Sequence, residues 1–472
     1  MATALFAMLA LLAGCGSDPD PVITDQPADF LDDLPLASVE DLDPDPHVLE
    51  VELTAQLAEI EIEPGVKSTV WTYNGSLPGP LLRLTAGDLL RVHFKNELPE
   101  ATTIHWHGLR IPNDMDGMPG HTQASVEPGE TFEYEFVVPD AGTFWYHPHE
   151  NDAAQLGFGM YGAIVVDPVE PEPADLGDEV VLVLSDISLD ESGALAPADQ
   201  GGDLATVFGR EGALVLANGK VAPTIHARNG KRQRWRVVNA ARSRYFQLEL
   251  AGHTFERVGG QAGLLSQSEE LEHLVLMPGE RAEVLVTPTG QADAQLAVNW
   301  IPFDRGYGST EYRDPIKVLA LDLEGAPIPR EADVATLGAP IDPIEVEHAT
   351  HVDIHLTLGE GPDGRPEMGI NGAPFGESPP VPAAVGETQV WTITNDMDWD
   401  HPFHLHGFFF QAVDREGKVV EPVEWRDTLN VVRKGESSRF VVRYDNRPGS
   451  WMFHCHILDH ADAGMMGMVE LE

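Results

Sequence analysis

Four His-X-His motifs contain eight of the 19 histidines in this 472-residue chain. They are His105-Trp106-His107, His147-Pro148-His149, His404-Leu405-His406 and His454-Cys455-His456. Side chains alternate between the two faces of a β-strand, so both imidazoles of each motif would point the same way. Neutral imidazole is a good ligand for copper, and eight imidazoles are too many for one ion. The motifs therefore predict a metal cluster rather than a single metal site.

Cys455 stands inside the last of these motifs and is one of two cysteines in the chain. Alternation turns its thiol away from the two neighbouring histidines, toward a face where it can meet His401 and His460. Two imidazoles and a thiolate with a weak thioether ligand form the blue-copper arrangement used for electron transfer. Met465 is the predicted thioether, with Met466 as the alternative. A mononuclear copper site is therefore expected beside the cluster.

An internal repeat determines where these motifs lie along the chain. An Asn-Gly turn followed by a strand begins at Tyr73, at Ala217 and at Ile370, and a Gly-Glu turn with further strands follows each copy. Many short, alternating strands separated by turns predict an all-β chain of three β-sandwich domains. Their expected bounds are 48–168, 178–325 and 345–472. Because only the first and third copies carry His-X-His, we expect the cluster between these domains and a middle domain that acts as a spacer.

The net charge limits the possible partners of the protein, and the N-terminal sequence indicates its location. The formal net charge of −48 would repel nucleic acid and acidic membranes, so neither is an expected partner. Residues 1–15 form an apolar run that ends in Leu12-Ala13-Gly14-Cys15 and resembles the lipobox of bacterial lipoproteins. A plain secretory signal is the alternative, because no Lys or Arg precedes the run. Residues 16–47 are expected to form an acidic tether. The protein is therefore predicted to be exported, periplasmic or at the cell surface, with a lipid anchor at Cys15.

The motifs resemble those of the three-domain multicopper oxidases, which include bacterial laccases, spore-coat laccases and cuprous oxidases. The resemblance covers nearly all of the mature chain and implies three consecutive cupredoxin-like Greek-key domains. It also implies four copper ions: one type 1, one type 2 and a type 3 pair. The implied type 1 ligands are Cys455, His401, His460 and the axial Met465, and the implied type 2 ligands are His105 and His404. The implied type 3 ligands are His107, His147, His149, His406, His454 and His456.

The resemblance implies an oxidase that couples one-electron oxidation of a reducing substrate to the four-electron reduction of O2 to water. Electrons would enter at the type 1 copper and pass through Cys455 and its neighbours His454 and His456 to the cluster. The cofactor carries this chemistry, and the protein positions the metals and tunes their potentials.

The reaction also consumes protons, which an acidic side chain must supply. Asp116 occupies the place where related enzymes keep an acid near the type 2 copper, although an ordinary turn aspartate has the same sequence pattern. Relatives often have a second acid directly after the last type 1 histidine, where this chain has Ala461. Asp459 and Asp462 flank that position and could replace it.

Three functions follow from these motifs. The leading prediction is a laccase-type oxidase of phenolic or other aromatic donors, and the other two are alternatives to it. The second is a metallo-oxidase of Cu(I), Fe(II) or Mn(II), whose cations would suit an acidic surface. The third is a copper-free structural cupredoxin protein, against which the complete ligand set argues. A monomer is expected. His348, His351 and His355 have irregular spacing, which favours a solvated cluster over an extra metal site.

Overall fold

The computed structural model describes residues 34–472, apart from 173–174, 307–312, 330, 332–333, 335–336 and 435–436. The predicted anchor at Cys15 and the first part of the tether lie outside the described residues. The end of the expected tether is not free, because Leu34 is buried and its carbonyl accepts a hydrogen bond from Asn218 (2.9 Å). Ser38 pairs with Leu81 of the first domain. No helix of the described part of the chain is long and apolar enough to cross a membrane.

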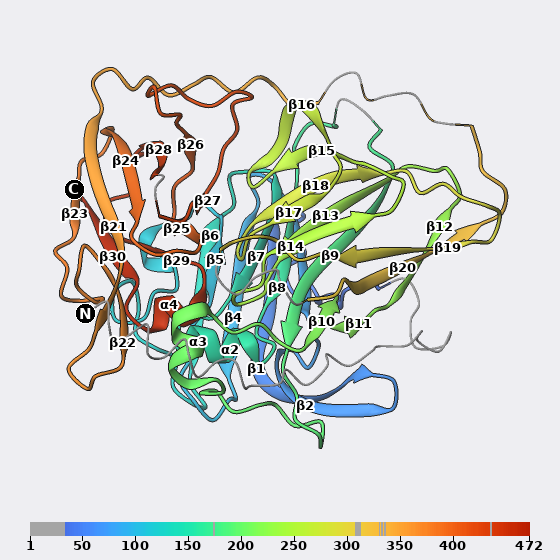
Figure 1. Ribbon diagram of the computed structural model, residues 1–472, viewed down its shortest axis with the longest axis horizontal. Helices are drawn as coiled ribbons and strands as arrows, with labels where there is room; N and C mark the ends of the chain where they lie inside the picture. Colours follow the sequence, from blue (N-terminus) through green and yellow to red (C-terminus); the bar gives the residue numbers. More distant parts are fainter. Residues whose placement is uncertain are drawn as a thin grey trace.

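The described residues form six β-sheets, two in each domain (Figure 1). This arrangement confirms the predicted all-β fold of three cupredoxin domains. The first domain has the strand orders β2-β1-β4-β6 and β3-β8-β7-β5. Its strands are β1 (Val48–Glu63), β2 (Val66–Tyr73), β3 (Gly79–Thr85), β4 (Leu89–Asn96), β5 (His105–His107), β6 (Thr131–Val137), β7 (Gly142–His147) and β8 (Gly162–Asp167).

The middle domain has a seven-stranded sheet, β11-β10-β9-β13-β18-β15-β16, and a five-stranded sheet, β12-β20-β19-β14-β17. Its strands are β9 (Asp178–Ile187), β10 (Leu214–Ala217), β11 (Lys220–Val221), β12 (Thr224–Arg228), β13 (Gln233–Asn239), β14 (Phe246–Leu250), β15 (Phe255–Gly260), β16 (Gly263–Leu271), β17 (Leu274–Leu276), β18 (Arg281–Val286), β19 (Gln295–Trp300) and β20 (Ile316–Glu324).

The third domain has two five-stranded sheets, β22-β21-β24-β28-β26 and β23-β30-β29-β25-β27. Its strands are β21 (Thr350–Glu360), β22 (Pro366–Ile370), β23 (Val381–Ala383), β24 (Thr388–Asn395), β25 (His401–Leu405), β26 (Phe410–Ala412), β27 (Thr428–Val431), β28 (Ser437–Arg443), β29 (Gly449–Cys455) and β30 (Met466–Leu471).

Hydrophobic alternation explains the outer strands. In β6, Tyr134 and Phe136 are buried, whereas Thr131, Glu133 and Glu135 face the solvent. One face of the strand therefore packs on the core of the first domain and the other stays wet. The central strand β13 is buried along its whole length, because β9 and β18 flank it and β7 of the first domain contacts it. Each domain has its own apolar core.

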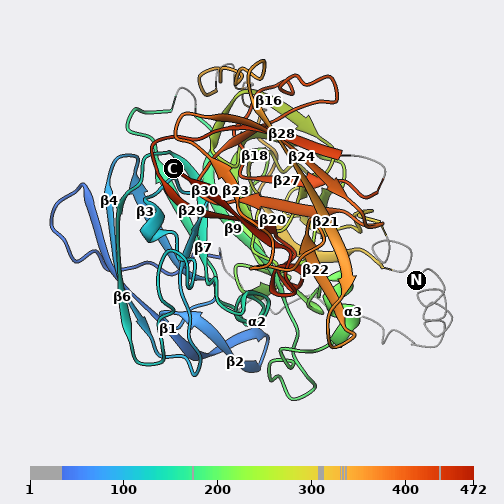
Figure 2. The same cartoon turned by 90° about the vertical axis from the view of Figure 1, so that its left-hand side faces the viewer.

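Three short helices, one from each domain, lie together in the structure. They are α2 (Asp152–Gly157), α3 (Gly202–Phe208) and α4 (Leu458–Asp462), and a 3-10 turn, η2 (Asn113–Met115), lies in the first domain. Both α2 and α3 contact α4, and Figure 1 shows the three helices together. In Figure 2 the first domain (blue to cyan) lies beside the third (orange to red), and the middle domain (green to yellow) lies largely behind the third. The sites described next lie where these domains meet.

Candidate metal centres

Antiparallel pairing within two sheets brings the His-X-His motifs together in pairs. In the first domain, His105 of β5 lies directly opposite His147 of β7. In the third domain, His404 of β25 lies directly opposite His454 of β29. Residues in such positions have Cβ atoms about 5 Å apart on one face of the sheet. Strand register therefore gathers four imidazoles in each of the two domains.

The two sets of imidazoles meet at the boundary between the first and third domains. His105 stacks on His406 with ring centroids 3.9 Å apart, and His107 stacks on His404 at 3.8 Å. Three buried triads that consist of histidines alone result, in each of which the ligand atoms lie within 4.8 Å of one another. The triads are His107, His147 and His456; His149, His406 and His454; and His105, His404 and His406. The first two triads coincide with the predicted type 3 ligands, and the third contains both predicted type 2 ligands.

The hydrogen bonding of the eight imidazoles fits a bound metal. All eight Nε2 atoms are buried and have no hydrogen-bond partner among the described residues. Meanwhile several Nδ1 atoms face backbone carbonyls: His105 faces Asp116 O (2.8 Å) and His454 faces Cys455 O (2.9 Å). A donated Nδ1–H leaves the Nε2 lone pair free for a metal, which is the usual orientation of metal-bound histidine. Buried polar atoms without partners are costly, and eight such nitrogen atoms in one place fit the coordination of metal ions.

Burial also selects the protonation state that can bind a metal. Desolvation lowers the pKa of His147, His406 and His454 well below the usual value for histidine. These imidazoles are neutral at neutral pH, as metal coordination requires. At His149 burial would also lower the pKa, but the Asp152 carboxylate, 2.9 Å from Nδ1, raises it instead. Asp152 thus orients this imidazole as a carboxylate partner does in other metal sites.

Cys455 lies on the opposite face of β29, as alternation predicts. Its Sγ is 3.5 Å from His460 Nδ1, and the rings of His401 and His460 are 5.0 Å apart. Met465 is fully buried in the same apolar core as the thiol. Burial raises the pKa of Cys455, so a cation is required to stabilise its thiolate. These four side chains can together hold one copper ion in the blue-copper arrangement.

The strand register also bears on which methionine could be the axial ligand. Met466 pairs directly with His454 across β29 and β30, and paired residues share a face of the sheet. Met466 is therefore on the side opposite the Cys455 thiol. This placement favours Met465 over Met466.

Asp116 does more than terminate a turn. The residue is buried, and its carboxylate Oδ2 lies 2.9 Å from His406 Nδ1. Its backbone oxygen faces His105 Nδ1 at the same time. One residue therefore orients a histidine from each of the two domains that form the cluster.

The two aspartates that flank Ala461 have different surroundings. Asp459 forms an ion pair with Arg210 of the middle domain (2.6 Å), so it faces away from the cluster. Asp462 accepts hydrogen bonds from the first two backbone N–H groups of α2, which begins at Asp152. Burial and the neighbouring Asp152 raise the pKa of Asp462 to about 7. Asp462 is thus the aspartate that connects, through Asp152, to His149 of the cluster.

The middle domain contributes residues that the motifs did not reveal. Arg281 is fully buried and forms an ion pair with Asp427 (2.7 Å), whose backbone oxygen faces His404 Nδ1. Burial alone would raise the pKa of Asp427, but Arg281 and His404 hold it well below its usual value. Gly279 approaches His456 so closely that an added Cβ would lie 2.7 Å from the ring. The predicted spacer therefore also braces the cluster, through contacts that no local sequence signal marks.

The mononuclear site is covered by α3. His401 and His460 are both fully buried. The Nε2–H of His460 donates to the carbonyl oxygen of Val207 (3.2 Å), near the end of α3. The next residue, Phe208, packs on Trp399 with ring centroids 5.2 Å apart. Backbone from the middle domain thus lies between this histidine and the solvent.

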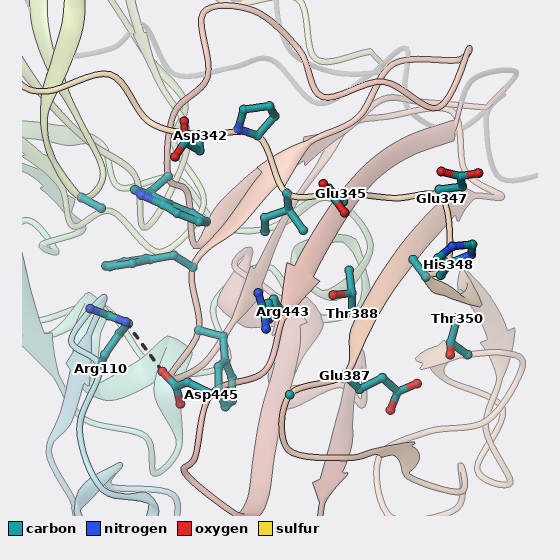
Figure 3. Close-up of a pocket in the computed structure, with 18 of the residues that line it drawn as sticks. Arg110, Asp342, Glu345, Glu347, His348, Thr350, Glu387, Thr388, Arg443 and Asp445 are labelled. Atoms are coloured by element: carbon teal, nitrogen blue, oxygen red, sulfur yellow. Dashed lines mark ion pairs between the residues drawn. The ribbon is translucent and has the colours of Figure 1, made fainter.

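A cavity of about 920 Å³ opens elsewhere, between the first domain, the segment 342–350 and the third domain (Figure 3). Arg110 and Asp445 form an ion pair across it (3.7 Å). Phe408 and Phe409 line it, but no predicted copper ligand does. His348 also lines the cavity, and no potential metal-binding group among the described residues includes His348, His351 or His355.

Three cupredoxin domains, of which the first and third form one histidine cluster, and a thiol site on the opposite face of β29, define an O2-reducing copper oxidase. The comparisons with known proteins agree. Sequence models of the multicopper oxidase family match residues 54–171, 178–305 and 345–472. The chain belongs to the multicopper oxidase family, and its cofactors are copper ions of types 1, 2 and 3.

The chain is similar to a protein named as a laccase and to one described as a metallo-oxidase, as well as to other multicopper oxidases. It is 33% identical to the multicopper oxidase MmcO of Mycobacterium tuberculosis, over 88% of this chain and 85% of that protein. It is 26% identical to the laccase of Bacillus subtilis, over 85% and 90% of the two chains. Among solved structures, a multicopper oxidase of Campylobacter jejuni described as a metallo-oxidase superposes with a TM-score of 0.81 at 29% identity, covering 95% and 99% of the chains.

Proposed function

We propose that this multicopper oxidase takes its electrons from a small metal cation such as Cu(I), Fe(II) or Mn(II), and that a bulky phenol is the poorer donor. The observation that carries the proposal is the cover over His460. A phenol that gives its electron by contact needs an exposed imidazole edge, and here Val207 occupies that edge. A small cation that docks on the outer face of the cover does not need such a contact.

Charge supports the same donor class. The chain has a net charge of −48, which raises the local concentration of cations and leaves a neutral phenol unaffected. This attraction weakens as salt screens it over a Debye length of about 10 Å at 0.1 M. The rate with a cationic donor should therefore fall with ionic strength, while the rate with a neutral donor should not.

A laccase-type activity is the second candidate, because the ends of α3 could let the cover move. Gly201 and Gly209 flank the helix and Gly202 is its first residue, with φ values of +88°, +75° and +52°, respectively. Glycine adopts such angles without strain and tolerates large changes in them. If α3 moves aside, the edge of His460 becomes available to an aromatic donor.

We assign the ligands as the family resemblance implies: Cys455, His401, His460 and Met465 at type 1; His105 and His404 at type 2; and the other six histidines of the cluster at type 3. When bound, these copper ions supply one-electron redox chemistry and the reduction of O2 to water. The chain positions them: Asp116 orients His105 and His406, and Asp152 orients His149. Asp116 and Asp462 are the carboxyl groups placed to hold and deliver protons near the cluster.

Oxygen uptake with different donors tests the proposed substrate. The copper-loaded enzyme should have a higher kcat/KM for Fe(II) or Cu(I) than for a dimethoxyphenol, and only the cation rates should fall with added salt. Phe208→Ala should loosen the cover and raise kcat/KM for the phenol, whereas Leu204→Ala, on an exposed part of α3, should not. A wild-type preference for the phenol that Phe208→Ala leaves unchanged would exclude the metal-cation proposal.

We further propose that the protein is exported and anchored by lipid at Cys15, and that it acts as a monomer. The support for export is the apolar run that ends in Leu12-Ala13-Gly14-Cys15. Cell fractionation tests it: Cys15→Ser should move the protein from the membrane fraction to the soluble exported fraction. Sedimentation of the purified protein tests the monomer.

A further inference from the structure

A separate cavity of about 390 Å³ lies in the middle domain against α3. Four arginines line it together with one acid, although the chain as a whole has a net charge of −48. These residues are Arg210, Arg242, Arg244, Arg313 and Glu211. Part of the wall comes from α3 and its flanking glycines, and the exposed Leu204 stands at the rim. None of these residues belongs to either copper site.

Three of the four arginines have carboxylate partners. Arg210 pairs with Asp459 (2.6 Å), and Arg244 pairs with Asp186 (2.7 Å). Arg313 pairs with Glu211, which Arg244 also approaches (3.2 Å). Among the described residues, three carboxylates thus pair with three of the four guanidinium groups that line the cavity, and one guanidinium is left without an ion pair.

Arg242 is the arginine without an ion pair. It is only 6% exposed, and no carboxylate oxygen of the described residues forms an ion pair with it within 4.0 Å, although Asp186 and Asp459 attract it from farther away. Its contacts are long hydrogen bonds to two backbone oxygens, those of Arg210 (3.3 Å) and Ala153 (3.4 Å). A guanidinium has five N–H donors and no acceptor, so Arg242 keeps donors to spare. A buried charge without a partner is costly, and a bound anion would remove that cost.

The surroundings of Glu211 agree with a positively charged cavity. Burial alone would raise the pKa of this carboxyl, but Arg244, Arg313 and Arg305 lower it to about 2. Burial also lowers the pKa of Arg242, which shows that its charge is poorly solvated. Both shifts would be relieved by an additional negative charge at the same place.

We propose that this arginine-lined cavity is a binding site for a small oxyanion, either a phosphate or a carboxylate, held chiefly by Arg242 and Arg313. The planar fork of each guanidinium donates two parallel hydrogen bonds to two oxygens of such a group. The volume is within the range of ligand sites in proteins, about 300–1,000 Å³. It admits inorganic phosphate with room for a larger substituent.

Calorimetric titration of the copper-loaded enzyme with inorganic phosphate, at constant ionic strength, tests the site. One saturable binding event is expected. Arg242→Gln and Arg313→Gln should each weaken it by about tenfold or more, as expected for loss of a charged hydrogen bond. Arg365→Gln is the matched control, since Arg365 pairs with Asp203 of α3 outside the cavity (2.9 Å), and it should leave binding unchanged.

A second variant and a second measurement keep the test decisive. If Arg242→Gln does not fold, Arg313→Gln suffices, because the Arg313 side chain is 34% exposed. Hydrogen exchange then locates the ligand: phosphate should slow exchange of amides in 200–213, which include α3. Absence of saturable binding, binding that neither variant weakens, or protection only outside 200–213 would each overturn the proposal. Acetate and sulfate in place of phosphate distinguish a carboxylate site from a phosphate site.

Discussion

The substitution Gly279→Ala should disable the cluster, although Gly279 is not itself a predicted copper ligand. This glycine lies in the turn between β17 and β18 of the middle domain, with φ of +86°. A Cβ there would lie 2.7 Å from Cδ2 and 2.9 Å from Nε2 of His456. Carbon atoms in contact stay about 3.5 Å apart or more, so the imidazole must retreat by about 0.8 Å. His456 would then leave its position with His107 and His147.

The structure allows this effect to be separated from backbone strain. Alanine in the left-handed region costs about 1–2 kcal/mol wherever it is introduced. Gly252, in the same domain, has a similar φ of +77°, and no atom lies within 4 Å of the position that a Cβ would occupy there. Gly252→Ala should therefore show the strain alone. A displacement near 1 Å at a reacting centre can lower turnover by about 100-fold, and this is the expected loss of kcat in Gly279→Ala.

Three measurements compare the two variants: copper content, visible absorption and oxygen uptake. Gly279→Ala should lose copper from the cluster and most of its oxygen uptake, but keep the visible thiolate absorption, because Cys455 faces the other site. Gly252→Ala should keep all three properties. Equal copper content and equal turnover in the two variants would show that the close approach to His456 has no role in the cluster.

Three further changes test other parts of the site. Cys455→Ser should abolish the visible absorption and the activity while leaving thermal unfolding nearly unchanged; retained activity would refute the assigned route for electrons. Arg281→Gln leaves Asp427 buried and unpaired, and should destabilise the apoprotein by about 3–5 kcal/mol; in the double variant with Asp427→Asn, thermal unfolding should recover most of this loss, and simple additivity would argue against the pair. Asp462→Asn should lower kcat and leave KM for the donor unchanged, as loss of a proton donor predicts, whereas Asp459→Asn should not; equal kcat values would remove Asp462 from the proton route.

Local sequence spacing predicted the parts of the site that strand geometry controls. His-X-His places two imidazoles on one face of a strand, and Cys455 between two histidines must face the other way. The repeat then assigned two motifs to each of two domains. These inferences need only the alternation of side chains, so they did not depend on how the domains pack.

The alternation of side chains along a strand cannot predict contacts between domains. Asp427, Arg281 and Gly279 lie far from most of the ligands in the sequence, and nothing in their neighbouring residues marks them. Asp152 could have been noticed, because it stands three residues after His149 and begins a short helix. The cover over His460 comes from α3, whose residue Val207 stands 253 positions before His460 in the chain. The proposed metal-cation donor rests on this cover.

The sequence by itself determined that this chain is a copper protein with a cluster and a thiolate site on opposite faces of one strand. That result follows from a period of two residues, which every β-strand shares. The tertiary structure alone decided which histidines form each triad, what orients them and what covers the type 1 ligands. These features depend on distances between side chains from three domains, and such distances are set by packing at the domain boundaries rather than by any local pattern.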